Sequence, residues 1–354
     1  MQEGTDATSG TFSINTAGLT DNSDGTATID LQAAHDNTDS REGLPTTHQV
    51  SFTYEDGNSC EQTVMYNFTI NPQPTLDIVL SGGGEFDATE VCYDESSYTI
   101  KGLETSGTAT SASDASTGTF VLYKTLSDAN SRTNAFSTSG FDGDNDDGTA
   151  TIIPSDISDD NSIARDGLPA TYYVVFSYTD ASSCSNESTT ESFTINPQPT
   201  LDINYEAATG KNLENADLAG SEVCYSEAGF LIRGIQEGAD ATSGSWSVST
   251  GGLVANTDGT ATFTPSATGS SATATTTHDI TFTYTDGNSC ENSVTRTVTV
   301  TPAPILDIAY NVATGSNTAG ATISATEVCF DQEAFTIVGK QNGNVAKADE
   351  ADVI

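Results

Sequence analysis

The sequence has very little positive charge. Of its 354 residues, 10 are Lys or Arg and 50 are Asp or Glu, which gives a formal net charge of −40. Nucleic-acid binding depends on clustered Lys and Arg that neutralise phosphates, so this composition argues against a nucleic-acid partner. The same deficit argues against docking on an anionic membrane surface.

Long hydrophobic runs are also missing. A membrane-spanning helix needs about 20 consecutive apolar residues, and no stretch of this sequence approaches that length, so we expect no membrane insertion. Leu, Lys, Arg and Gln are scarce, which disfavours long helices. Thr, Val, Ile and aromatic residues recur in short alternating bursts that suit pleated strands. The composition therefore predicts an acidic, all-β protein.

What the sequence does contain is a repeat. The segment SFTYEDGNSC at 51–60 returns as TFTYTDGNSC at 281–290, and a shorter version ends at Cys184. A proline-containing segment at 71–78 returns at 196–203 and 301–308, and Glu-Val-Cys at 90–92 returns at 222–224 and 327–329. Self-similarity at a fixed period indicates a row of similar structural units.

The order of these segments predicts four pieces. We expect a partial repeat at 1–73 (the C-terminal part), complete repeats at 75–198 and 200–303, and a partial repeat at 305–354 (the N-terminal part). About seven short strands per repeat, with Asp-Gly turns between them, favour tandem immunoglobulin-like β-sandwich repeats. Short Pro-x-Pro linkers favour an elongated rod. Neighbouring repeats of the same longer chain are therefore expected partners.

Six cysteines occupy two repeated positions. We predict the disulfides Cys92–Cys184 and Cys224–Cys290, each inside one repeat and each stabilising by ~4–5 kcal/mol in the chain-entropy model. Cys60 and Cys329 would then have partners outside this stretch of chain. Zinc is the alternative, but no Cys-x-x-Cys or nearby His supports it. Disulfides favour an extracellular location.

The sequence offers few residues suited to catalysis. Among its three histidines, His48 and His278 share one repeat position, where the middle repeat has Tyr172 and Tyr173. We interpret that position as a surface strand position, and His35 is solitary. Trp246, the only Trp, is expected to be a core aromatic. We therefore predict no enzymatic activity and no certain cofactor, because hydrolysis needs a positioned base or paired carboxylates in a pocket.

The middle repeat carries an insertion. Its landmark aromatic residue and its Asp-Gly turn are 28 residues apart, against 13 in the first and third copies. Insertions in a sandwich fall in loops, and loops often carry function. The insertion contains a candidate ligand loop, namely Lys124, Arg132, Phe136 and Phe141. The alternative is a tolerated surface insertion or an extra edge hairpin.

The insertion ends in an acidic run. Alternating aspartates resemble a calcium loop, in which hard oxygen ligands surround a hard cation. The candidate calcium ligands are Asp142, Asp144, Asp146 and Asp147. The glycine falls one place late and no Glu follows at EF-hand spacing, so an acidic solvated turn remains the alternative.

The shared motifs resemble a known class of repeats. Val-Cys-Tyr, Gly-Ser-Trp, Phe-Thr-Tyr-Thr-Asp-Gly-Asn-Ser-Cys and Val-Thr-Val-Thr-Pro-Ala-Pro are similar to the Ig-like or PKD-like repeats of giant cell-surface adhesins of Bacteroidota. These include the gliding-motility adhesins exported by type IX secretion. The resemblance implies an extracellular protein of the bacterial cell surface that contacts surface polysaccharide or other cell-surface proteins. It transfers no active-site residues.

Three functional hypotheses follow. The leading one is a structural stalk segment of a giant extracellular adhesin or surface filament that presents an adhesive tip. The second is a self-assembling filament, in which the partial repeat at 305–354 of one chain completes the partial repeat at 1–73 of another by strand addition. The third is a set of accessory modules of a secreted polysaccharide hydrolase.

Overall fold

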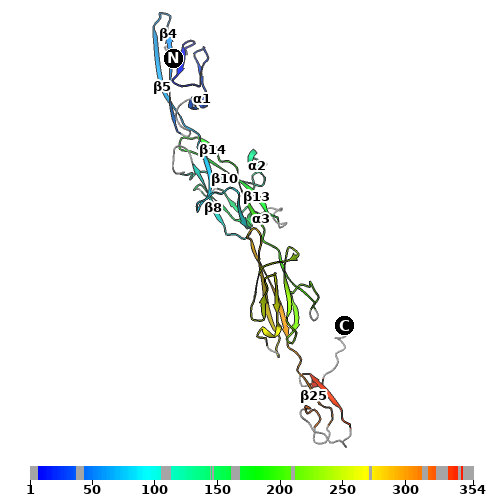
Figure 1. Cartoon of the computed structure of the whole chain (residues 1–354). Helices are drawn as coiled ribbons and strands as arrows, with labels where there is room; N and C mark the ends of the chain where they lie inside the picture. The colour runs from blue at the N-terminus through cyan, green and yellow to red at the C-terminus, as the bar shows by residue number, and fades with distance from the viewer. Residues whose placement is uncertain are drawn as a thin grey trace. The chain divides into compact units, whose positions relative to one another are not determined.

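The structure is a computed structural model. It describes residues 7–36, 44–104, 113–143, 145, 147–160, 168–208, 212–270, 273–312, 318–323, 334–341 and 344–345. The chain forms two units, of which the first comprises residues 1–198 with Asn288–Cys290 and the second comprises 199–287 and 291–354. Nearly all regular elements are strands (Figure 1), as the alternating sequence pattern predicts.

The middle repeat is a two-sheet sandwich. One sheet has the order β10 (Thr119–Tyr123), β13 (Ala170–Thr179), β15 (Glu191–Asn196), β7 (Thr89–Cys92), with β14 (Ser185–Glu187) beside β13. The other has the order β11 (Phe141–Asp142), β12 (Thr149–Ile152), β8 (Tyr98–Glu104), β6 (Leu76–Leu80), with β9 (Ser113–Asp114) beside β8. Side chains of both sheets, such as Ile100, Phe176 and Phe193, form one buried core. The predicted immunoglobulin-like sandwich is confirmed.

The third repeat has the same architecture. One sheet runs β16 (Leu201–Tyr205), β18 (Phe230–Gln236), β22 (Thr260–Phe263), β21 (Leu253–Ala255), with β19 (Ala239–Asp240) beside β18. The other runs β17 (Ser221–Cys224), β24 (Glu291–Thr301), β23 (Thr276–Thr285), β20 (Ser245–Val248). In both repeats the Glu-Val-Cys strand is parallel to its neighbour, whereas the other pairs are antiparallel.

The two end pieces hold parts of this architecture. Residues 7–70 form the sheet β1 (Thr11–Ile14), β4 (Thr46–Glu55), β5 (Glu61–Ile70) and the pair β2 (Leu19–Asp21), β3 (Ala27–Ile29). The C-terminal piece forms β25 (Leu306–Tyr310), β26 (Ile337–Gln341) and β27 (Asn344–Val345). Short helices α1 (Leu31–Asp36), α2 (Leu126–Ser131) and α3 (Pro154–Asp160), with the 3-10 turn Pro265–Ala267, complete the described elements.

One aromatic ring packs against glycine in each sandwich. A Cβ atom added at Gly234 on β18 would lie 2.3 Å from the ring of Phe282, and one at Gly102 on β8 would lie 2.0 Å from the ring of Phe176. Glycine is present inside these strands because the ring from the opposite sheet occupies the space of a side chain. Trp246 packs beside Phe282 with 4.7 Å between ring centroids, in keeping with its predicted core role.

The structure corrects the interpretation of the two repeated histidines. His48 and His278 are buried, with 0% and 3% exposure, and do not lie at the surface. The His278 ring nitrogens lie 2.7 Å from Thr250 Oγ1 and 2.9 Å from Thr276 Oγ1. Tyr172, which replaces His278 in the middle repeat, is also fully buried, so a Tyr at this position did not indicate the surface. Burial lowers the pKa of His278.

The helices of the described segments are short. None of them has the length and apolar character that crossing a bilayer requires.

The ring-on-glycine packing predicts a sensitive position. We expect Gly234→Ala to lower the unfolding free energy of the third repeat by about 1–3 kcal/mol, the usual range for overpacking a core. The reason is that the new Cβ would overlap the Phe282 ring. Gly287→Ala is the matched control, because a Cβ there meets nothing within 4 Å. Equal thermal melting curves for the two variants would contradict this packing.

Candidate functional site

The disulfide in the structure joins two different repeats. Cys92 bonds to Cys290 across 198 residues of sequence, with 5.5 Å between their Cα atoms. Cys184 and Cys224 are free thiols. The predicted pairs Cys92–Cys184 and Cys224–Cys290 are therefore wrong. The turn Asn288–Cys290 belongs to the first unit, together with residues 1–198.

Strand direction explains why the predicted pairs do not form. Cys92 at the end of β7 lies opposite Asn196, and the neighbouring Ile195 lies opposite Ala170, where β13 begins. Cys184 instead follows the far end of β13, which is ten residues long. Ten residues of strand span ~30 Å, whereas a disulfide needs Cα atoms within ~7 Å.

Each hairpin turn presents its cysteine in one fixed conformation. The Asp56 carboxylate accepts backbone N–H groups of Asn58 at 2.8 Å and of Cys60 at 2.9 Å, and these bonds lower the pKa of Asp56. Asp180 accepts the N–H of Cys184 at 2.8 Å in the same way. The residue before each cysteine is a Ser with positive φ, 63° at Ser59 and 67° at Ser289. The motif Asp-x-x-x-Cys therefore builds a cysteine-presenting turn.

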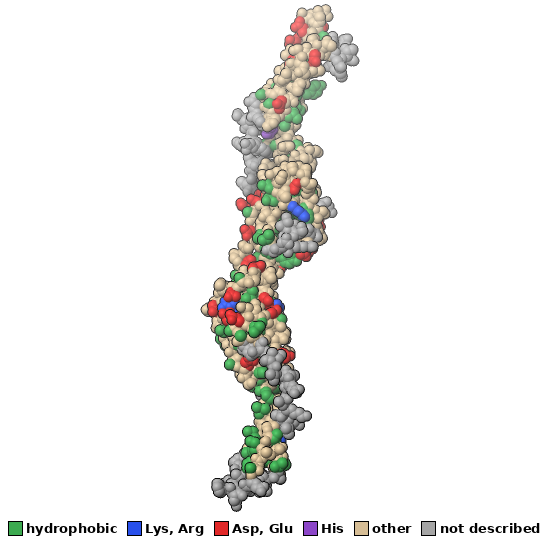
Figure 2. All heavy atoms as spheres, turned by 90° about the vertical axis from the view of Figure 1, so that its right-hand side faces the viewer, with side chains coloured by type: hydrophobic (Ala, Val, Ile, Leu, Met, Phe, Trp, Pro, Cys, Tyr) green, Lys and Arg blue, Asp and Glu red, His purple; other side chains and the backbone are tan. Residues whose placement is uncertain are grey.

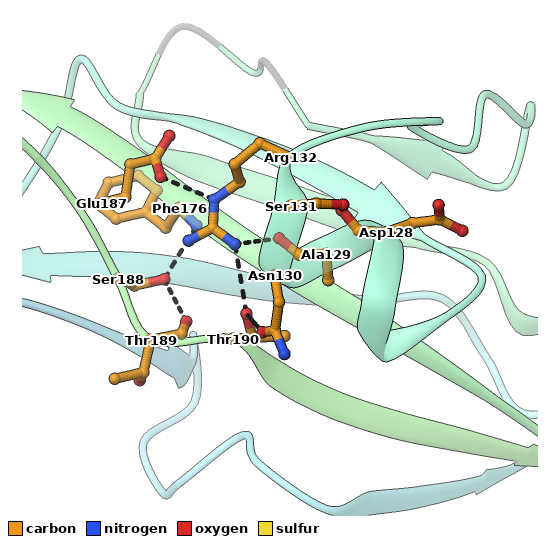
Figure 3. Close-up of polar contacts among 10 residues, drawn as sticks. All are labelled: Asp128, Ala129, Asn130, Ser131, Arg132, Phe176, Glu187, Ser188, Thr189 and Thr190. Atoms are coloured by element: carbon orange, nitrogen blue, oxygen red, sulfur yellow. Dashed lines mark hydrogen bonds and ion pairs between the residues drawn. The ribbon is translucent and has the colours of Figure 1, made fainter.

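Polar contacts stabilise the insertion of the middle repeat (Figure 3). Thr125 caps α2 by accepting the N–H of Asp128 at 3.1 Å, and Arg132 ends the helix in a left-handed conformation with φ 55°. Arg132 Nε lies 2.7 Å from Glu187 Oε2, and the guanidinium also donates to the Ala129 carbonyl. Arg132 of the candidate ligand loop is thus paired inside its own repeat.

The other three residues of the candidate ligand loop also have packing roles. Lys124 Nζ lies 4.0 Å from the ring centroid of Phe136, a cation–π contact. Phe136 stacks on Tyr172 with 6.1 Å between centroids. Phe141 opens β11 and pairs with Ile152. These contacts explain the residues without a ligand, and the ligand loop itself stays a prediction.

The acidic run is described only in part. Asp144 and Asp146 lie outside the described residues. The Asp147 carboxylate accepts the backbone N–H of Thr149 at 3.0 Å and its hydroxyl at 2.5 Å, as Asp258 does with Thr260 in the third repeat. In the described part of the chain no three His, Cys, Asp or Glu side chains are grouped to hold a metal ion. Calcium at Asp142 to Asp147 stays a prediction.

One position on the last strand of the sandwich holds a basic residue in the third repeat and an acidic residue in the middle repeat. Arg296 lies opposite Ile280 on β23 and binds Asp202 at 2.6 Å and Asp217 at 3.1 Å. The counterpart in the middle repeat is Glu191, opposite Val174. Burial raises the pKa of Glu191 to about 8, and the negative charges of Asp77 and Asp87 add to that rise. Alignment of the repeats in the sequence shows this change from a basic to an acidic residue. That the Glu191 side chain is buried could be seen only in the structure.

Comparison with known proteins finds structures with low sequence identity and low TM-scores. No family model matches the chain, and no curated protein matches it. Several solved structures match the chain at low sequence identity. Protocadherin gamma B7 extracellular cadherin domains 1–4 are 14% identical, with coverage of 82% of this chain and 66% of that one and a TM-score of 0.27.

Two further structures match at similar levels. Drosophila N-cadherin EC1-4 is 10% identical over 96% of this chain and 78% of its own, with a TM-score of 0.28. A 1.5-MDa bacterial ice-binding adhesin is 15% identical over 77% of this chain and 78% of its own, with a TM-score of 0.32. These likenesses carry no argument about what this chain does.

The disulfide connectivity leads to a chemical prediction. Digestion of the oxidised chain without reductant should yield one peptide pair that joins Cys92 to Cys290. Mass spectrometry should find Cys184 and Cys224 alkylated by a thiol reagent, because neither is bonded within the chain. A cross-linked peptide of Cys92 with Cys184 would contradict the conclusion that these two cysteines lie at opposite ends of one sandwich.

The buried carboxyl of Glu191 leads to a pH prediction. Its pKa rises from 4.5 to about 8 on folding, so the unfolded chain loses this proton first as pH rises. The carboxyl therefore lowers stability progressively between pH 4.5 and 8, by at most about 4–5 kcal/mol. Glu191→Gln should melt like the unchanged chain at pH 4 and at a higher temperature at pH 8.

Two comparisons sharpen this measurement. Glu191→Arg should stabilise the middle repeat further at pH 8, because it places a cation beside Asp77 as Arg296 lies beside Asp202. Glu85→Gln is the control, since Glu85 is an exposed carboxylate of the same repeat. Equal melting shifts for Glu191→Gln at pH 4 and pH 8 would refute the raised pKa.

Proposed function

We propose that this chain is a stalk segment of an extracellular adhesion protein on a bacterial cell surface. The observation that carries the proposal is the Cys92–Cys290 bridge, which links cysteines of two successive sandwich repeats. A bond between repeats serves a row of modules that must stay connected under load. Disulfides of this kind persist in oxidising surroundings, which supports an extracellular location.

The side-chain chemistry suits a scaffold. Cationic side chains are used in contacts within their own repeats, as Arg132 with Glu187, Arg233 with Glu206 and Lys101 with Asp114. The face in Figure 2 shows scattered acidic side chains and few basic ones. Like charge keeps neighbouring molecules apart and a long chain soluble. A surface of this kind suits an extended protein whose copies must not aggregate side by side.

The mechanism is mechanical. Force on the two ends of an oxidised chain bypasses the segment between Cys92 and Cys290, which have a sequence separation of 198, because the bridge carries the load. The modules inside that loop are then protected from extension while the stalk holds an adhesive tip away from the cell. The Pro-x-Pro segments would act as short, stiff links in an elongated rod.

The motif resemblance suggests the finer identity. A giant adhesin of the gliding-motility type, exported by type IX secretion, would hold such repeats as its stalk. Its contacts with surface polysaccharide or other cell-surface proteins would then lie at the tip or in the loop of the middle repeat. Calcium at the acidic run belongs to the same proposal.

Single-molecule stretching tests the mechanical role. Pulled by its ends, the oxidised full chain should unfold without releasing the residues between Cys92 and Cys290. Reduction should add about 650–710 Å of contour length, at ~3.3–3.6 Å per residue over the sequence separation of 198.

Two variants serve as controls in the stretching experiment. Cys92→Ser should behave like the reduced chain under oxidising conditions. Cys184→Ser, which removes a free thiol, should behave like the unchanged oxidised chain. If oxidised and reduced chains release the same length, the load-bearing role is refuted.

A further inference from the structure

A groove opens in the middle repeat beside the loop that joins β6 to β7. Its volume is about 600 Å³. The apolar side chains of Leu80, Val91 and Tyr98 line it. All three are partly exposed, although they pack against the buried core of the sandwich. The groove thus opens solvent access to one edge of the core.

The third repeat buries the same three positions. Its residues there are Tyr205, Val223 and Phe230, with exposures of 0%, 2% and 7%. The Tyr205 ring packs on Phe230 with 5.3 Å between centroids. The C-terminal piece has the same pair, Tyr310 and Phe335, also at 5.3 Å. A six-membered ring therefore occupies this place in two other copies, where the middle repeat has a leucine.

The loop beside the groove is short and has little side-chain bulk. Five residues separate Leu80 from the buried Phe86, whereas twelve separate their counterparts Tyr205 and Leu218. Three of the five are the glycines at 82–84, and a Cβ added at any of them would meet nothing within 4 Å. The leucine and the glycines together leave open the space that a ring fills elsewhere.

The rest of the lining is polar and acidic. It consists of Ser and Thr hydroxyls, two glycines and the carboxylates of Glu90 and Glu95. Among the described residues that line the groove, none carries a positive charge. Burial raises the pKa of Tyr98, and the negative charge of Glu95 adds to that rise, which places this carboxylate near the Tyr98 side chain. An anionic ligand is therefore disfavoured.

This lining suits a sugar ring. A pyranose has an apolar face of C–H groups and a border of hydroxyls, and ligand sites commonly combine an apolar lining with a few polar groups. Carboxylates and the hydroxyls of Ser and Thr accept hydrogen bonds from sugar hydroxyls. An aromatic side chain of a peptide would fill the same space, but it would give these polar groups no new partners.

We propose that the groove of the middle repeat binds one uncharged pyranose of a polysaccharide. The sugar ring takes the place that Tyr205 holds in the third repeat, with its C–H face against Leu80 and Tyr98 and its hydroxyls toward Glu90 and Glu95. A stalk repeat thereby gains a binding role of its own, outside the insertion. That the polysaccharide belongs to a cell surface rests on the extracellular location proposed above, whereas the groove does not depend on the load-bearing bridge.

Saturation-transfer NMR on the oxidised full chain measures sugar binding directly. The neutral probes are the methyl glycosides of glucose, galactose, mannose and N-acetylglucosamine, and the acidic probe is the methyl glycoside of glucuronic acid. At least one neutral probe should receive saturation, and the acidic probe should not, because the groove has two carboxylates. No transfer to any neutral probe, or transfer to the acidic probe at the same level, would overturn the proposal.

A matched pair of tyrosine variants locates the binding. Leu80→Tyr should abolish saturation transfer, because it fills the groove with the ring that the third repeat carries at this position. The third repeat buries that ring fully, so we expect the variant to fold, and its melting curve checks this. Leu168→Tyr should bind normally, since Leu168 is 59% exposed and lies outside the groove. Equal transfer with both variants would overturn the proposal.

Backbone amide shifts locate the site without any variant. Titration of the unchanged chain with the bound neutral probe should shift the amides of Gly82, Gly83 and Ser96, which line the groove, and leave those of α2 in place. Shifts confined to the insertion, or groove shifts caused by a Phe-containing tripeptide and by no sugar, would overturn the proposal. A chain that binds no sugar but passes the stretching test would refute the sugar site and leave the stalk role standing.

Discussion

The packing of one Phe ring on strand glycine is the contact on which each sandwich depends. The ring comes from the long hairpin of one sheet, and the glycine belongs to the opposite sheet, at Gly102 or Gly234. The ring and the glycine bring the two sheets into contact in the middle of the core, among the other buried apolar side chains.

Strand polarity imposes the second constraint. The Glu-Val-Cys strand runs parallel to the last strand, so its cysteine lies level with the start of the long hairpin, while the turn cysteine lies at its other end. Two cysteines at opposite ends of one sandwich cannot bond to each other. Cys92 bonds instead to Cys290 of the following repeat.

The sequence was sufficient for the fold class and insufficient for the pairing of sulfurs. Alternating apolar residues and Asp-Gly turns predict short strands, and the repeat spacing locates the insertion. Cysteine spacing contains no information about which end of a sandwich each sulfur occupies. The buried histidine could have been found, because His48 alternates with Phe52 and Val50 on the same face of its strand. The contacts of Arg132 with Glu187 needed the structure, since 55 residues separate them.

The position held by Tyr66, Glu191 and Arg296 shows how one backbone accommodates different chemistry. In the third repeat a cation holds two aspartates, and in the middle repeat a buried carboxyl keeps its proton beside Asp77. In the first part-repeat the position is Tyr66. In the two complete repeats the neighbouring aspartate, Asp202 or Asp77, comes from the first strand of the same repeat, β16 or β6. A buried charge needs a partner, so the cation at this position pairs with its aspartate, whereas the carboxyl beside an aspartate is stable only with its proton.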